Sequence, residues 1–109
     1  MERGQREVIR MAVDQATALG LVKARLNRLQ SDTSLDTYFR ARIAAAEEYL
    51  TGIGIALTDS QEDLLLVVDF AVWEYQNRDK PGNMPEWLRL HRRERWLRLR
   101  EGEGDQNDP

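Results

Sequence analysis

The segment 59–78 constrains the fold most strongly, because a helix formed there is apolar on nearly every side. Its main apolar face consists of Leu64, Leu65, Val67, Val68, Ala71, Val72 and Tyr75. The opposite side mixes acidic residues with Leu66, Phe70 and Trp73. A helix with two apolar sides needs neighbours on more than one side. We therefore predict that this segment is the most buried helix of a small bundle.

The segment 35–50 has the clearest one-sided pattern in the chain. Its apolar residues fall on one face at 100° steps, and its acidic residues fall opposite. Ser34 is suited to cap the start of this helix, and Gly52 is suited to stop it. Residue 42 breaks the pattern, because Arg42 projects from the apolar face.

Two weaker helical segments complete the predicted bundle. Residues 19–29 carry apolar side chains at spacings of three and four, with Thr17 as a candidate cap. The segment 85–100 is preceded by Asn83 and Met84, and Asn83-Met84-Pro85-Glu86 is a typical helix start.

At the start of the segment 59–78, Thr58-Asp59-Ser60-Gln61 fits a capping box in which Thr58 is the cap.

These segments predict an all-α fold, a small bundle of four main helices. We expect the helices near residues 19–29, 35–50, 59–78 and 85–100. A further N-terminal helix within residues 5–16 is an open alternative. A single domain spans 1–100, and the Gly-rich acidic residues 101–109 are expected to form a disordered tail.

Composition excludes several kinds of site. The chain has no cysteine, which rules out disulfides and thiolate metal sites. No apolar run approaches the roughly 20 residues of a membrane span. The N-terminus shows no signal-peptide pattern, so we expect a cytoplasmic location and no membrane partner.

No motif predicts catalysis, so we expect no enzymatic activity. His91 is the only histidine, and it lacks an evident orienting partner. The pairs Glu47-Glu48 and Glu62-Asp63 are adjacent in sequence and point about 100° apart on a helix. Gly52-Ile53-Gly54 is better interpreted as a helix stop than as a dinucleotide loop. We predict no catalytic residue, no cofactor and no metal.

The last segment is rich in arginine. Residues 86–100 hold six Arg and two Glu, a local charge of +4, whereas residues 101–109 hold four acids and no base. Three interpretations remain open: ion pairing across a subunit interface, which we favour, a solvated helix face, or direct phosphate contact.

The order of segments resembles the small all-helical head–tail connector (adaptor) proteins of long-tailed phages and prophages. The most specific stretches are 43–52, Ile-Ala-Ala-Ala-Glu-Glu-Tyr-Leu-Thr-Gly, and 73–78, Trp-Glu-Tyr-Gln-Asn-Arg. Val22-Lys23-Ala24-Arg25-Leu26 precedes them. The resemblance covers roughly residues 17–100.

The resemblance implies a homo-oligomeric ring, with the portal's twelvefold symmetry in the virion, although the isolated chain can be monomeric. Such a ring joins the portal to the next head-completion protein. DNA passes through its axial channel without sequence-specific binding. The location implied is the virion, and the host cytoplasm during assembly. The competing hypothesis is a small helical nucleic-acid-binding regulator that uses the Arg-rich helix.

A ring needs two different complementary surfaces on each subunit. We expect Leu66, Phe70 and Trp73 to form one apolar patch beyond the subunit's own core. The last helix has two apolar stripes, Trp87/Leu90/Leu97 for its own bundle and Leu88/Trp96/Leu99 for a neighbour. We expect four arginines of the last helix to meet acidic residues of the next subunit, such as Glu47 and Glu48. The four are Arg89, Arg92, Arg93 and Arg95.

Arg42 and Asp69 each interrupt an otherwise apolar region of a helix. An unpaired buried charge is costly. We therefore expect each residue to find an opposite charge or several hydrogen bonds, and the two are candidates for a buried ion pair with one another.

Overall fold

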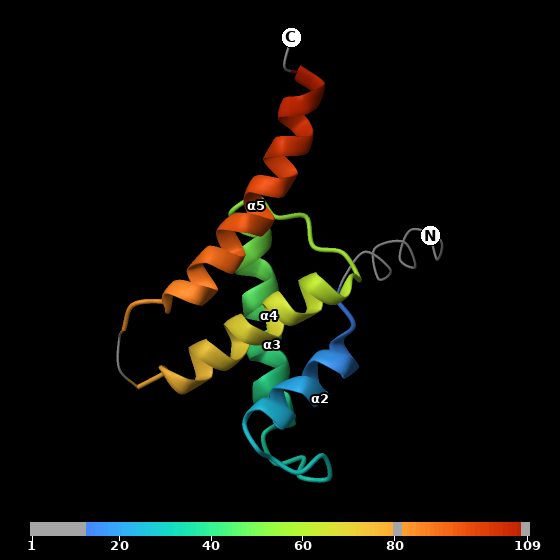
Figure 1. Cartoon of the computed structure of the whole chain (residues 1–109). Helices are drawn as coiled ribbons and strands as arrows, with labels where there is room; N and C mark the ends of the chain where they lie inside the picture. Colours follow the sequence, from blue (N-terminus) through green and yellow to red (C-terminus); the bar gives the residue numbers. More distant parts are fainter. Residues whose placement is uncertain (1–12, 80–81, 108–109) are drawn as a thin grey trace.

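The computed structural model describes residues 13–79 and 82–107, and residues 99–107 in backbone only. This part of the chain is all-α, as predicted, and contains no β-strand. Its helices, shown in Figure 1, are α2 (Gln15–Arg25), α3 (Asp36–Gly52), α4 (Gln61–Gln76) and α5 (Glu86–Asn107). None of the helices in the described part is both long and apolar enough to cross a membrane.

Helix α4 forms the centre of the bundle. It packs against α2, α3 and α5, and it crosses α3 in Figure 1. Eight of its residues are buried, against four in α2 and four in α3, which confirms that this helix is the most buried of the three. The surrounding core includes Phe39, Ile43 and Leu50 from α3 and Val22 from α2. Most apolar residues on both sides of α4 are thus covered within one subunit, although Leu65, predicted on the main apolar face, is 47% exposed.

Helix α2 begins and ends four residues earlier than the sequence pattern predicts. Its N-cap is Asp14, whose carboxylate accepts the backbone N–H of Thr17, so Thr17 is not the cap. Asn27 adopts a left-handed conformation, with φ of 60°, and this ends the helix. Leu29 is therefore off the helix and 74% exposed.

The start of α3 also differs from the prediction. Its N-cap is Leu35, which supplies no side-chain hydrogen bond. The hydroxyl of Ser34 instead donates to Asp32, and the Asp32 carboxylate also accepts the Ser34 backbone N–H. Ser34 prefers this local turn over the capping role that its residue type suggested.

A glycine turn ends α3. Gly54 has φ of 106°, and its N–H donates to the Thr51 carbonyl, while the Ile55 N–H donates to the Leu50 carbonyl. This pair of bonds is a Schellman motif. Ile55 and Leu50, which the motif brings together, are both buried. The predicted stop is present, but Gly54 makes the turn and Gly52 is the last helical residue.

At the start of α4 the cap is Ser60 and not Thr58. The Ser60 hydroxyl accepts the backbone N–H of Asp63 at 3.2 Å. The Asp63 carboxylate in turn accepts the N–H of Thr58 at 2.7 Å and its hydroxyl at 3.0 Å. The cap is therefore two residues later than predicted, and the reciprocal bond of a capping box does not form there, because the Ser60 N–H donates to Thr58 Oγ1 at 3.2 Å and not to Asp63.

Helix α5 begins at Glu86, directly after Pro85, and continues to Asn107. Its first half lies against the body, and its second half projects away from it (Figure 1). The disordered tail predicted from residue 101 is not confirmed, because the helix continues through most of that segment. The N-terminal helix expected within residues 5–16 falls mostly on residues 1–12, which lie outside the described residues.

Candidate functional site

The apolar patch predicted for a subunit interface is mostly part of the core. Leu66 is 0% exposed and Phe70 is 2% exposed, while Trp73 is half-buried. Phe70 packs its ring against that of Tyr49 from α3, with centroids 5.5 Å apart. The prediction failed because α4 has neighbours on several sides, so its second apolar side needs no other subunit.

The two apolar stripes of α5 have the opposite roles to those predicted. Leu88 is completely buried and Trp96 packs against the core. Trp87 and Leu90, expected inside the bundle, are 52% and 45% exposed. The side chain of Leu99 lies outside the described residues.

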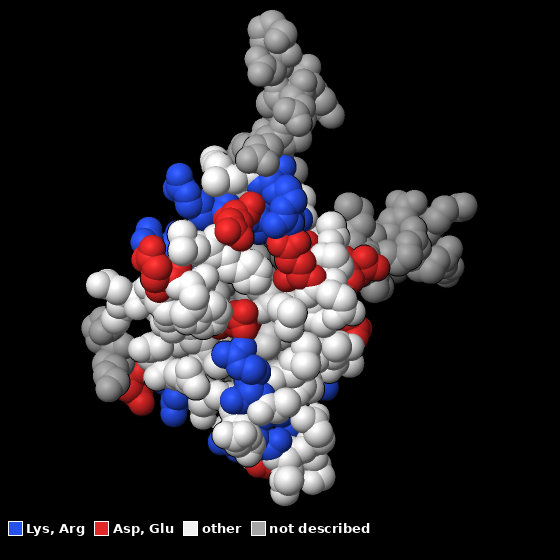
Figure 2. Space-filling model, viewed as in Figure 1, with Lys and Arg blue, Asp and Glu red and all other residues white. Residues whose placement is uncertain are grey.

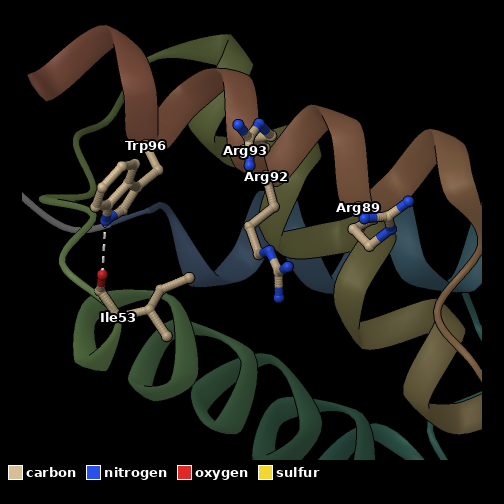
Figure 3. Close-up of a pocket in the computed structure, with 5 residues that line it drawn as sticks. All are labelled: Ile53, Arg89, Arg92, Arg93 and Trp96. Atoms are coloured by element: carbon tan, nitrogen blue, oxygen red, sulfur yellow. Dashed lines mark hydrogen bonds between the residues drawn. The ribbon is translucent and has the colours of Figure 1, made fainter. Parts of the chain in front are cut away.

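Trp96 is fixed against the end of α3. Its indole N–H donates to the carbonyl oxygen of Ile53 at 2.9 Å, as Figure 3 shows. This bond satisfies the polar atom of an otherwise apolar side chain. It therefore sets the position of α5 relative to the turn that ends α3.

Arg95 points into the subunit, although it was predicted at an interface. Its Nε donates to Asp63 Oδ1 at 2.8 Å, and its Nη2 donates to Asp63 Oδ2 at 3.1 Å and to the Ala56 carbonyl at 2.8 Å. The Asp63 side chain is 1% exposed. Burial acts to raise the pKa of Asp63, but hydrogen bonds from Arg95 and Thr58 outweigh it and hold this pKa below its ordinary value. Arg95 is thus a structural residue.

Of the other α5 arginines whose side chains are described, Arg89, Arg93 and Arg98 are exposed and Arg92 is half-buried. Arg89 pairs with Glu86 and Arg98 pairs with Glu62. Arg92 donates to the phenol oxygen of Tyr49 at 2.5 Å. Arg93 is exposed and, among the described residues, makes no ion pair. Figure 2 shows basic and acidic side chains next to one another where α5 crosses the body.

Three of these arginines border a shallow pocket of about 290 Å³. The lining residues, drawn in Figure 3, are Ile53, Arg89, Arg92, Arg93 and Trp96. We call this the arginine pocket. Among the described residues no acidic side chain lines it, and its three arginines give this part of the surface a positive character. An anionic group fits such a site, because guanidinium groups bind carboxylate and phosphate bidentately.

The predicted role of Glu47 as an intersubunit partner has no geometric support. Its carboxylate accepts a hydrogen bond from Gln15 Nε2 at 2.7 Å, which ties α3 to α2. Burial raises the pKa of Glu47, although the bond from Gln15 acts in the opposite direction. Glu48 is exposed and is available at the surface.

Arg42 and Asp69 do not pair with one another, which corrects one prediction. Arg42 lies 3.5 Å from Glu74 and donates to the Tyr38 hydroxyl at 2.9 Å. Asp69 pairs with Arg25 of α2. The broader expectation, that each finds an opposite charge, is confirmed.

Sequence reasoning missed the pocket itself. Its floor combines the turn after α3 with a helix more than thirty residues later, and no local pattern links Ile53 to Trp96.

Within the described residues, no three His, Asp or Glu side chains are grouped as metal ligands. Comparisons with family models, curated proteins and solved structures found no match.

Proposed function

We propose that this chain is a non-catalytic structural subunit that assembles into a phage head–tail connector ring. The observation that carries the proposal is the exposed pair Trp87 and Leu90 on α5, which lies on a different side of the helix from the residues of the arginine pocket. In this proposal the ring lies beneath the portal with its twelvefold symmetry and binds the next head-completion protein. DNA passes through its channel without sequence-specific contact.

The exposed pair has the properties of an interface core. Trp87 and Leu90 are three residues apart, so they are neighbours on the helix surface. They are 52% and 45% exposed, and the arginines of the pocket flank them in sequence. Tryptophan and arginine are the residues most enriched at binding hot spots. An exposed apolar pair that includes a tryptophan is suited to contact another protein.

The fold is compatible with the proposal. The most specific stretches of the resemblance, 43–52 and 73–78, lie in or next to α3 and α4, and an all-α bundle is compatible with an all-helical family. The last helix, α5, supplies the exposed face. The proposal thus combines a resemblance in the bundle with an open surface on its last helix.

The nucleic-acid-binding regulator has less support. Arg89, Arg95 and Arg98 are each paired with an acidic side chain, which reduces the positive charge available to phosphates. Affinity for a duplex depends on neutralising several phosphates at once. Arg92 and Arg93 alone offer a small contact for that purpose.

Electron microscopy of the concentrated protein, alone and with the portal protein encoded by the same phage or prophage, tests the proposal. We expect rings with an axial opening, and complexes that contain both proteins. Sedimentation in parallel gives the mass of the assembly. A chain that stays monomeric at high concentration and also with the portal present contradicts the proposal, and tight salt-dependent duplex binding by a dimer favours the regulator.

A further inference from the structure

We propose that the arginine pocket is the receptor for the acidic C-terminal segment, residues 101–109, of a second copy of this chain. The inference rests on the proposed function, because it names one contact between neighbouring subunits. It is carried by the charge of the pocket, by its position on α5 and by the composition of the segment that follows.

Two of the three guanidinium groups in the pocket, those of Arg92 and Arg93, have no anionic partner among the described residues. Arg92 donates only to the neutral phenol of Tyr49, and Arg93 has no ion pair among the described residues. Arg89 shares its charge with Glu86, which is 67% exposed and therefore well solvated. Each guanidinium has five N–H donors, so most donors here remain available to a ligand.

The wall of the pocket favours binding of an anion. The indole of Trp96, held by the Ile53 carbonyl, provides an apolar surface next to the arginines. A concave surface with one sign of charge and a wall of low dielectric concentrates the electric field. A carboxylate that enters is screened less than one on a flat, exposed surface.

The acidic segment complements this pocket in charge. It contains Glu101, Glu103, Asp105 and Asp108 and no basic residue, a sum of −4. The pocket contributes three arginines. Carboxylates and guanidinium groups form paired hydrogen bonds, so a segment with several acids can engage more than one arginine. The length of the segment suits a shallow, open site.

The geometry of α5 favours a segment that comes from another copy. The helix is continuous from Glu86 to Asn107 and projects from the body (Figure 1). Twelve residues separate Arg93 from Asp105, which is about 18 Å along a helix axis at 1.5 Å per residue. At that spacing, the helix backbone at residue 105 lies well beyond the subunit's own pocket. A contact between two different surfaces is heterologous and can close into a ring.

A charge-exchange experiment on the full chain tests this contact. One variant carries Arg92→Glu and Arg93→Glu, and a second carries Glu101→Lys, Glu103→Lys, Asp105→Lys and Asp108→Lys. Each variant alone places like charges at the contact, whereas an equal mixture restores opposite charges at both contacts. Sedimentation velocity measures association at about 0.05 M and about 0.5 M salt, because screening increases over that range.

We expect the wild type to associate more strongly at low salt, each variant to stay monomeric, and the mixture to associate again. Arg93→Glu alone should weaken association roughly tenfold at low salt. Arg40→Glu is the matched control, since Arg40 is also exposed and has no ion pair among the described residues. It should behave like wild type. Circular dichroism confirms that each variant is folded.

Several results would overturn the inference. These are a wild type that never associates, a pocket variant that associates like wild type, or a mixture that stays monomeric. Duplex DNA binding that Arg92→Glu/Arg93→Glu abolishes, without self-association, would assign the pocket to phosphate instead. Rings that persist in the pocket variant would overturn this contact and leave the connector proposal standing. Salt-sensitive dimers that never form rings would support this contact and contradict the connector proposal.

Discussion

Arg95 and Asp63 form a two-bond ion pair that fastens the middle of α5 to the first turn of α4. The donor–acceptor distances are 2.8 and 3.1 Å, and the two side chains are 12% and 1% exposed. The same arginine binds the Ala56 carbonyl in the loop between α3 and α4. One side chain therefore joins a helix, a loop and a second helix.

Removing the charge of Arg95 should destabilise the subunit. In Arg95→Met, Asp63 is left buried without its cation, and breaking a buried pair in this way costs about 3 kcal/mol of unfolding free energy. Urea unfolding followed by circular dichroism measures the change. The control is Arg98→Met, which removes an exposed pair with Glu62 and should have little effect. Equal effects in the two variants would contradict a structural role for Arg95.

The same pair predicts a dependence of stability on pH. Because the pKa of Asp63 in the folded chain is lower than its ordinary value of 3.8, the ionised group stabilises the fold above that value. This contribution is lost as the pH falls below 3.8 towards the pKa of the folded state. Unfolding free energies from urea titrations at several acidic pH values measure it. Asp63→Asn should be less stable at neutral pH and lose stability less steeply in acid.

Phe70→Ala should destabilise the isolated subunit strongly. The side chain is 2% exposed and packs against Tyr49, so its removal leaves a cavity. Such substitutions cost about 3–5 kcal/mol. Thermal and urea unfolding of dilute, monomeric protein provide the measurement. A variant with wild-type stability would return Phe70 to the interface role predicted from the sequence.

Trp87→Ala should have the opposite profile. Trp87 is 52% exposed, so the monomer should keep most of its stability. If the indole of Trp87 anchors a subunit interface, its removal should weaken assembly by about 2 kcal/mol or more. Sedimentation at matched concentrations measures assembly, and circular dichroism checks the fold. Unchanged assembly would remove the main support for the proposed interface on α5.

Gly54→Ala should destabilise the turn after α3. Gly54 has φ of 106°, where a side chain is strained, and the expected cost is about 1–2 kcal/mol. Gly52→Ala is the matched control, because it lies two residues earlier in helical conformation and an added methyl group meets nothing within 4 Å. That substitution should stabilise the chain by about 0.5–1 kcal/mol. Urea unfolding of both variants separates the two cases.

The periodicity of apolar residues was sufficient to predict the all-α fold and the central position of α4. The spacing of apolar residues along one helix depends on that helix alone, so it is visible in the sequence of the segment. Helix ends were less predictable, since several polar residues compete for each cap. Ser60, and not Thr58, caps α4 because Asp63 binds Thr58 instead.

The face of each helix that remains exposed was not predictable from period alone. Leu88 and Trp87 are adjacent in sequence, and both are apolar enough for a core. The side of α5 that packs against α4 carries Leu88, which is buried, whereas Trp87 is 52% exposed. Ion pairs depend on the same arrangement, so Arg42 meets Glu74 and Asp69 meets Arg25.

The attachment of α5 implies an order in which the subunit opens. Helices α2, α3 and α4 are held together by a shared apolar core, whereas α5 contributes a single completely buried residue among those described, Leu88. Its other contacts are the partly buried indole of Trp96 against the core and polar bonds from Arg92, Arg95, Trp96 and Arg98. Such a helix can detach as a unit while the other three stay folded. Amide hydrogens of α5 should therefore exchange with solvent sooner than those of α4, and acid should widen the difference.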